Sequence, residues 1–109
     1  MAHYLLQLSY TPEGWEAMLR HPQNRIEAVA PTLERLGAGF EAAYLSFGEY
    51  DVVAFVEAPD NVSAAAMSMA FTAGGAIKSI KTTPLLTVDE GIEAMRKAAE
   101  AARTYRPPS

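Results

Sequence analysis

A phenol and a carboxylate stand next to each other at Tyr50 and Asp51, immediately before an apolar run at 52–56. At the entrance of a strand, such a pair can donate and accept a proton. His3 is the third candidate, because it lies on the face of another expected strand and can point into a pocket. We therefore predict Tyr50, Asp51 and His3 as catalytic residues of an acid–base reaction. The alternative is structural: Asp51 accepts backbone N–H groups of its own turn, and Tyr50 packs over the hairpin.

Aromatic side chains and one arginine are candidates for binding a small molecule. A binding pocket between a sheet and its helices is typically apolar and carries a few polar groups. The alternative is that the aromatic side chains only form the core, as they commonly do. The predicted ligand-binding residues are Tyr10, Trp15, Arg25, Tyr44 and Phe47.

The residue types exclude several kinds of site. Without cysteine, the chain has no disulfide, no thiolate nucleophile and no zinc–thiolate centre. Its two histidines, His3 and His21, are far apart and have no partner at metal-ligand spacing, so we predict no metal site. Ser46 lacks a nucleophile-elbow frame, and Gly74-Gly75 lacks the Lys-Ser/Thr of a phosphate-binding loop. We therefore predict no cofactor.

The elements that position these residues follow from the hydrophobic periodicity. Residues 3–10 alternate with a period of two, which predicts a strand. Thr11 and Pro12 start a short helix that is interrupted at His21-Pro22, where His21 marks the helix boundary. We expect strands at 3–10, 40–47, 51–57 and 76–86, and helices after Thr11, over 26–36, over 61–74 and after Thr87.

Turn and capping residues mark where these elements begin and end. Gly48 lies in the expected hairpin turn, where a positive φ is often needed. Asp60 is a suitable N-cap for the third helix, and Thr87 with Glu90 forms a capping box for the last one. The last helix is expected to bury a stripe formed by Ile92, Met95, Ala99 and Ala102.

The helix expected over 61–74 has an unusual composition, because no charged side chain occurs between residues 61 and 77. A helix on the surface of a monomer normally turns a charged face to water. We therefore expect this helix to be buried on two sides, against the sheet and against another chain or a ligand. The alternative is a small exposed apolar face, which proteins tolerate.

The order of the elements predicts the fold class. The order β-α-β-β-α-β, followed by a last helix, is typical of the α+β ferredoxin-like fold, with a four-stranded antiparallel sheet and helices on one face. The bare face of that sheet would be apolar, because apolar residues occupy both sides of the strand at 51–57. We therefore expect two sheets to pair across a two-fold axis as a dimeric α+β barrel.

The residues around the hairpin turn resemble the signature of a known family. The turn Gly48-Glu49-Tyr50-Asp51, the apolar run 52–56 and the Glu-Ala-Pro-Asp at 57–60 are similar to the GYD domain, named for a Gly-x-Tyr-Asp motif. The resemblance covers roughly residues 4–88. It implies a small bacterial protein with a fold similar to dimeric α+β barrel proteins, and it implies no particular reaction.

The bulk properties set the class of protein. A chain of 109 residues, 50% of them hydrophobic, is one domain with a real core, which we expect over 1–104 with an extended Pro-rich tail at 105–109. A net charge of −4 gives no electrostatic reason to bind nucleic acid. No segment has the layout of a signal peptide or the length of a membrane span, so we expect a cytoplasmic protein.

Two classes of function remain open. The first is a small-molecule-binding protein, which would be a cofactor-free acid–base enzyme if the bound molecule reacts. The second is a non-catalytic homo-oligomeric module that binds an effector or a protein through the uncharged helix. A cavity between sheet and helices favours the first class.

Overall fold

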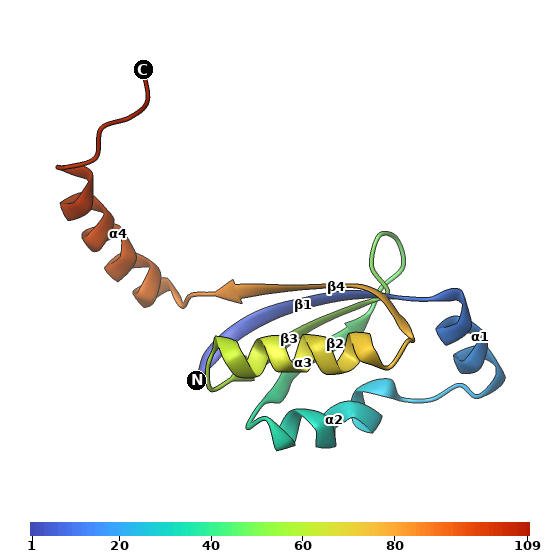
Figure 1. Ribbon diagram of the computed structural model, residues 1–109. Helices are drawn as coiled ribbons and strands as arrows, with labels where there is room; N and C mark the ends of the chain where they lie inside the picture. Colours follow the sequence, from blue (N-terminus) through green and yellow to red (C-terminus); the bar gives the residue numbers. More distant parts are fainter.

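The computed structural model describes residues 1–109 as a single sheet flanked by helices (Figure 1). The predicted order of elements is confirmed, and the boundaries differ from those expected by at most two residues at most ends. The elements are β1 (Ala2–Tyr10), α1 (Pro12–Arg20), α2 (Arg25–Arg35), β2 (Gly39–Leu45), β3 (Val52–Ala58), α3 (Asn61–Ala73), β4 (Ile77–Leu85) and α4 (Val88–Ala102).

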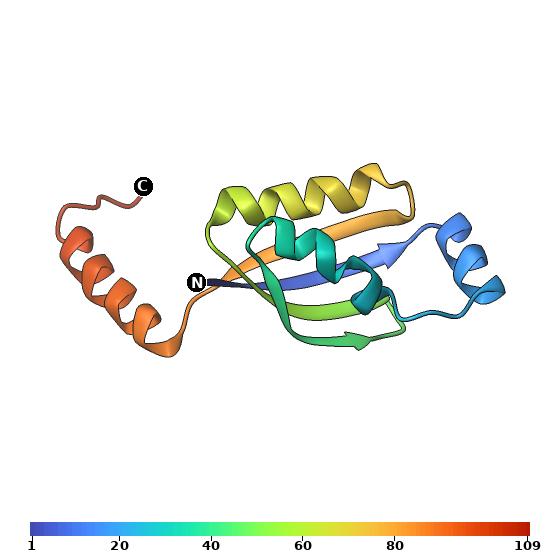
Figure 2. The ribbon, with the colours of Figure 1, turned by 90° about the horizontal axis from the view of Figure 1, so that it is seen from below.

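The sheet has four strands in the order β2-β3-β1-β4, and every neighbouring pair is antiparallel. β1 and β3 are therefore the central strands, and β2 and β4 form the edges. The predicted α+β class with a four-stranded antiparallel sheet is confirmed. In Figures 1 and 2, α2 and α3 cover one face of this sheet and α1 lies beyond its end.

One face of the sheet makes the hydrophobic core under α2 and α3. Alternate residues of the central strands point to this face, as the period of two in their sequences predicts. Leu33 of α2 and Met67 of α3 close the core from the helix side and are fully buried. The strand residues of the core are Tyr4, Leu6, Leu8, Val52, Ala54, Val56 and Ala58.

The opposite face, which we call the outer face, is covered by no helix of the chain (Figure 1). Its register pairs Leu5 with Phe55 across the central strands and Tyr44 with Val53 at the β2 edge. Phe55 is 40% exposed and Tyr44 is 65% exposed. The expectation that apolar residues occupy both faces of β3 is therefore confirmed.

The predicted helix starts are confirmed. Thr11, Asp60 and Thr87 are the N-caps of α1, α3 and α4, and each side chain accepts a backbone N–H of the first turn. The capping box of Thr87 with Glu90 is complete. His21 is the C-cap of α1, as expected for a helix-boundary residue.

The hairpin loop between β2 and β3 spans residues 46–51 and is longer than the predicted turn, because β2 ends at Leu45. Gly48 has a φ of 144°, so the predicted positive φ is confirmed. Ser46 donates its side-chain hydroxyl to the Tyr50 carbonyl at 2.7 Å, which closes the loop on itself. Phe47, at the tip, is completely exposed.

The predicted burial of the last helix is wrong for the single chain. No residue of α4 is buried, and Ile92 and Met95 are 39% and 69% exposed. α4 leaves the end of β4 and projects away from the sheet (Figures 1 and 2), so no element of the same chain reaches its apolar stripe. The radius of gyration is accordingly 17.5 Å, whereas a compact domain of this size has about 13 Å.

The uncharged helix α3 is buried only on the side that faces the sheet. Ala64 and Met67 lie in the core, whereas Val62 and Met69 are 79% and 70% exposed. The second buried side that its composition predicts is absent from the single chain. None of the helices is both long enough and apolar enough to cross a membrane.

Candidate functional site

A cavity of about 480 Å³ lies between the core face of the sheet and the three helices α1, α2 and α3. Its wall is mainly hydrophobic and includes Leu8 of β1, Ile26 of α2 and Phe71 of α3. Gly14 of α1 also lines it, and a Cβ added there would lie 2.8 Å from the Ala76 carbonyl oxygen. The close approach of these two backbones therefore shapes one end of the cavity.

A second hollow of about 690 Å³ adjoins the first under the end of α1. The two share wall residues that include Tyr10, Gln23 and Arg25. Trp15 and Tyr44 line only the second hollow. Together the two hollows form one mainly apolar cleft, and three of its polar residues, Tyr10, Gln23 and Arg25, lie where the hollows meet.

Arg25 is the cation at this junction. It is the first residue of α2, its side chain donates to the Gln23 side-chain oxygen at 3.0 Å, and it takes part in none of the ion pairs of the chain. A positive charge is unfavourable at a helix N-terminus, where the backbone N–H groups already carry partial positive charge. The guanidinium therefore stands beside an apolar cleft and forms no ion pair with a carboxylate, since Glu41 of the second hollow is bonded to His3 instead.

Tyr10 lies beside Arg25 at the end of β1. Burial raises the pKa of the Tyr10 phenol; the positive charge of Arg25 opposes this rise and the negative charge of Asp51 adds to it. The phenol therefore stays protonated at neutral pH and can donate a hydrogen bond. Its ring packs edge-on against Trp15 at a centroid distance of 5.5 Å.

Asp51 joins the hairpin loop to β1 and α1. Its Oδ2 accepts the Tyr10 backbone N–H at 2.9 Å and the Trp15 indole N–H at 3.2 Å. The Asp51 backbone N–H donates to the Leu8 carbonyl at 2.7 Å. Under the structural alternative, Asp51 was expected to accept N–H groups of its own turn. This detail is wrong, because the donors belong to β1 and α1. A local turn pattern gives no sign of these distant partners.

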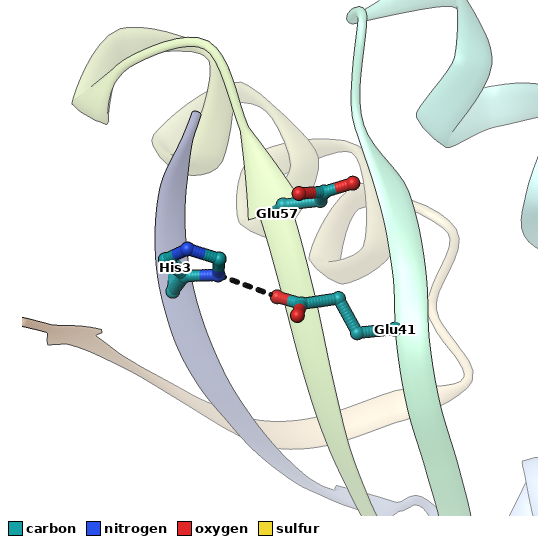
Figure 3. A group of neighbouring side chains, drawn as sticks. All are labelled: His3, Glu41 and Glu57. Carbon is teal, nitrogen blue, oxygen red and sulfur yellow. Dashed lines mark hydrogen bonds and ion pairs between the residues drawn. The ribbon is translucent and has the colours of Figure 1, made fainter. Parts of the chain in front are cut away.

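His3 lies on the outer face, near the other end of β1, and lines neither hollow (Figure 3). Its Nδ1 lies 2.7 Å from Oε1 of Glu41, and Glu57 is the third member of the group. The hydrogen bond and the charge of Glu41 raise the pKa of His3, and the charge of Glu57 adds to this effect. The expectation that His3 points into the pocket is wrong. Successive side chains of a strand point to opposite faces, and His3 lies on the face opposite to that of the core residues of β1.

The structure therefore separates the predicted catalytic residues and gathers most of the predicted binding residues. His3 pairs with Glu57, whereas Asp51 precedes the pair of Val52 with Leu8, so about six strand steps or roughly 20 Å separate the two sites. Tyr10, Trp15, Arg25 and Tyr44 line the cleft, and Phe47 does not. Tyr50 lies in the hairpin loop and also lines neither hollow.

Sequence reasoning missed Gln23, Glu41 and Glu57 as site residues. Gln23 follows a helix end and precedes α2 by two positions, so it has no periodicity that would mark it. Glu41 and Glu57 belong to different strands, and only the sheet register brings them beside His3.

A model of the GYD domain matches residues 4–95. The chain belongs to the GYD domain family. The matched segment contains the Gly-x-Tyr-Asp motif at 48–51, and it continues into α4, beyond the end of the resemblance seen in the sequence. In this GYD domain the motif aspartate connects the hairpin loop to β1 and α1 through hydrogen bonds, and the motif glycine has the positive φ of the loop. A comparison with curated proteins finds no match.

Proposed function

We propose that this GYD domain binds a small amphipathic molecule in the cleft between its sheet and helices. One observation carries the proposal: Arg25 stands at the wall of an apolar cavity with no carboxylate partner. A ligand with an apolar body and a carboxylate, sulfonate or phosphate head would fill the cavity and pair with the guanidinium. Arginine is well suited to this role because its planar fork donates two parallel hydrogen bonds to such anions.

The other polar groups support the same ligand class. The neutral Tyr10 phenol and the Gln23 amide are hydrogen-bond donors beside Arg25. The cavity of about 480 Å³ falls in the range of pockets that enclose small organic molecules. Of the residues around this first cavity only Tyr10 and Arg25 are titratable, and no carboxylate or imidazole that could act as a general base lines it. We therefore favour binding without acid–base turnover in this cavity.

A fluorescent probe tests this proposal directly. Anilinonaphthalene sulfonate has an aromatic body and an anionic head, and phenylnaphthylamine is a comparable probe without the charge. We expect Arg25→Met to weaken sulfonate binding about tenfold, the loss of one charge-assisted contact, and to leave the uncharged probe nearly unaffected. Ala70→Phe, which places a ring in the cavity wall, should weaken both probes.

The control is Arg20→Met, because Arg20 is an exposed arginine of α1 that lines neither hollow. Equal sulfonate affinity of the wild-type protein and both cleft variants would contradict the proposal, since the probe would then bind elsewhere. A screen of natural amphipathic acids by thermal shift would follow. A ligand present at a hundred times its Kd should stabilise the fold by about 2.7 kcal/mol.

A second function is favoured by two uncovered apolar surfaces. The outer face exposes Phe55 and Tyr44, and α4 exposes Val88 and Met95. We propose that a second copy of the chain covers both surfaces, so that two ferredoxin-like sheets pair as a dimeric α+β barrel and each α4 docks on its partner. α4 projects away from the sheet, so its apolar stripe contacts no other element of its own chain.

A further inference from the structure

We propose that His3, Glu41 and Glu57 bind one divalent transition-metal ion such as Zn²⁺ on the outer face of the sheet. An imidazole nitrogen and two carboxylate oxygens are ligands that such ions accept. One ligand atom from each residue lies within 4.8 Å of the other two. Figure 3 shows the three side chains converging above β3 from three neighbouring strands.

The distances allow a single ion to join all three groups. Ligand atoms bound at about 2.0–2.2 Å from one ion lie within about 4.4 Å of one another. Nδ1 of His3 and Oε1 of Glu41 are hydrogen-bonded at 2.7 Å, so the two atoms must separate to about 3.4 Å, the spacing of ligand atoms around a tetrahedral ion, for both to bind it. In the single chain the side chains of His3 and Glu41 are 34% and 38% exposed, so small rotations can complete the set. In the dimer proposed above the outer faces of two sheets pair, so this site would lie between the two chains.

The backbone holds the three residues at this point of the sheet. His3 pairs directly with Glu57, and Glu57 pairs in turn with Gly39 of β2. Gly39 has no side chain, and a Cβ built there would meet nothing within 4 Å. The register of β2 shifts between Phe40 and Ala42, so the bulged Glu41 extends over β3 to His3.

The local charge favours a cation. Two carboxylates share this site with one imidazole, and no lysine or arginine forms an ion pair with either carboxylate. A divalent ion with a neutral imidazole balances both carboxylates at once.

The proposed metal site and the proposed ligand cleft share one residue, Glu41. The metal cluster lies on the outer face, whereas the first cavity lies on the helix face of the same sheet. None of His3, Glu57 and Gly39 lines either hollow; Glu41 borders the second one from the edge strand. Loss of metal binding should therefore leave the binding of the uncharged naphthylamine probe unchanged.

Titration calorimetry with ZnCl₂ on the untagged full chain tests the proposal, because an affinity tag of histidines would bind the same ion. We expect one Zn²⁺ per chain. Co²⁺ should compete for the site and give visible absorption bands of a coordinated ion. His3→Gln should weaken Zn²⁺ binding at least about tenfold, since even the hydrogen-bond partners of metal ligands matter by about 10- to 100-fold.

The matched control is His21→Gln, which removes the other histidine at an exposed position of the α1 C-cap. Glu57→Gln provides a second test, because it keeps the size of the side chain and removes one charge. Circular dichroism without metal checks that each variant is folded. The proposal is overturned if the wild-type chain binds no Zn²⁺, or if folded His3→Gln and Glu57→Gln bind it as tightly as His21→Gln does.

Discussion

The carboxylate of Asp51 lies 3.2 Å from the indole nitrogen of Trp15, and this bond joins the hairpin loop to the first helix. The same oxygen accepts the backbone N–H of Tyr10, where β1 ends and the chain turns toward α1. The aspartate of the Gly-x-Tyr-Asp motif therefore fixes the position of α1, whose residues form part of the cleft wall. This contact explains how a loop residue outside the cleft can control its shape.

Replacing Asp51 should lower stability and move Trp15. Asp51→Ala removes the acceptor of two hydrogen bonds and should lower the free energy of unfolding by about 1–3 kcal/mol. Asp51→Asn keeps one acceptor oxygen and should lose less. Because Trp15 is the sole tryptophan, its emission spectrum reports the change directly. Trp15→Phe is the matched variant: it keeps an aromatic ring beside Tyr10 and loses only the donor. An unaltered urea midpoint in Asp51→Ala would contradict the structural role.

Gly48→Val should destabilise the chain through backbone strain alone. The φ of 144° is one that side-chain-bearing residues rarely adopt, and a Cβ at this position would touch nothing within 4 Å. We expect a loss of about 1–3 kcal/mol in the free energy of unfolding. Gly39→Val is the control, since it also enters open space but without a positive φ. Equal denaturation midpoints of the two variants would show that the loop does not require glycine.

The N-cap of α3 should contribute a pH-dependent part of the stability. The backbone N–H of Ser63 donates to Asp60 and lowers the pKa of this carboxyl below its ordinary value of 3.8. A lowered folded-state pKa stabilises the fold above the unfolded-state pKa, and this stabilisation is lost as the pH falls through the folded-state value. Asp60→Asn keeps a neutral cap. The free energies of unfolding in urea should therefore differ between Asp60→Asn and the wild type at pH 7 and become nearly equal near pH 2. A difference that does not change with pH would refute the assignment.

The unmodified chain should sediment as a dimer or a higher oligomer. An aspartate placed at Phe55 would put a charge in the proposed contact, so Phe55→Asp should dissociate the assembly or make it insoluble. Ala54→Asp, on the neighbouring core position with no exposed area, should instead unfold the subunit. Analytical ultracentrifugation of the wild type is the direct measurement. A monodisperse species of 11.8 kDa at micromolar concentration would exclude this assembly.

Most of the fold was predictable because it depends on local patterns. The alternation in β1 and the caps at Thr11, Asp60 and Thr87 each determine an element within a few residues. The burial of α4 was not predictable in the same way. Its apolar stripe predicts a helix that packs against another surface, but a stripe carries no information on whether that surface belongs to the same chain.

The residues of the candidate site were likewise predictable only where local sequence features indicate them. Tyr10, Trp15 and Arg25 were predicted as ligand-binding residues because their side-chain types suit a pocket between sheet and helices, and they line the cleft. The cluster of His3 with two glutamates was not predicted. Its three residues belong to three different strands, and their spacing along the chain does not reveal the register of the sheet. The separation of His3 from Asp51 follows from the length of the strands. The sequence predicts this length, but the length alone does not give the position of the hairpin loop.

The bulge in β2 also bears on how the sheet avoids uncontrolled growth. As an edge strand, β2 presents unpaired N–H and C=O groups to which a strand of another molecule can add. The irregular register between Phe40 and Ala42 interrupts that ladder, and Glu41 places a charge at the interruption. The other edge carries two lysines and Pro84 in β4. Straightening the bulge by deleting Glu41 would thus restore a continuous edge and should make the protein prone to aggregate as extended β-structure.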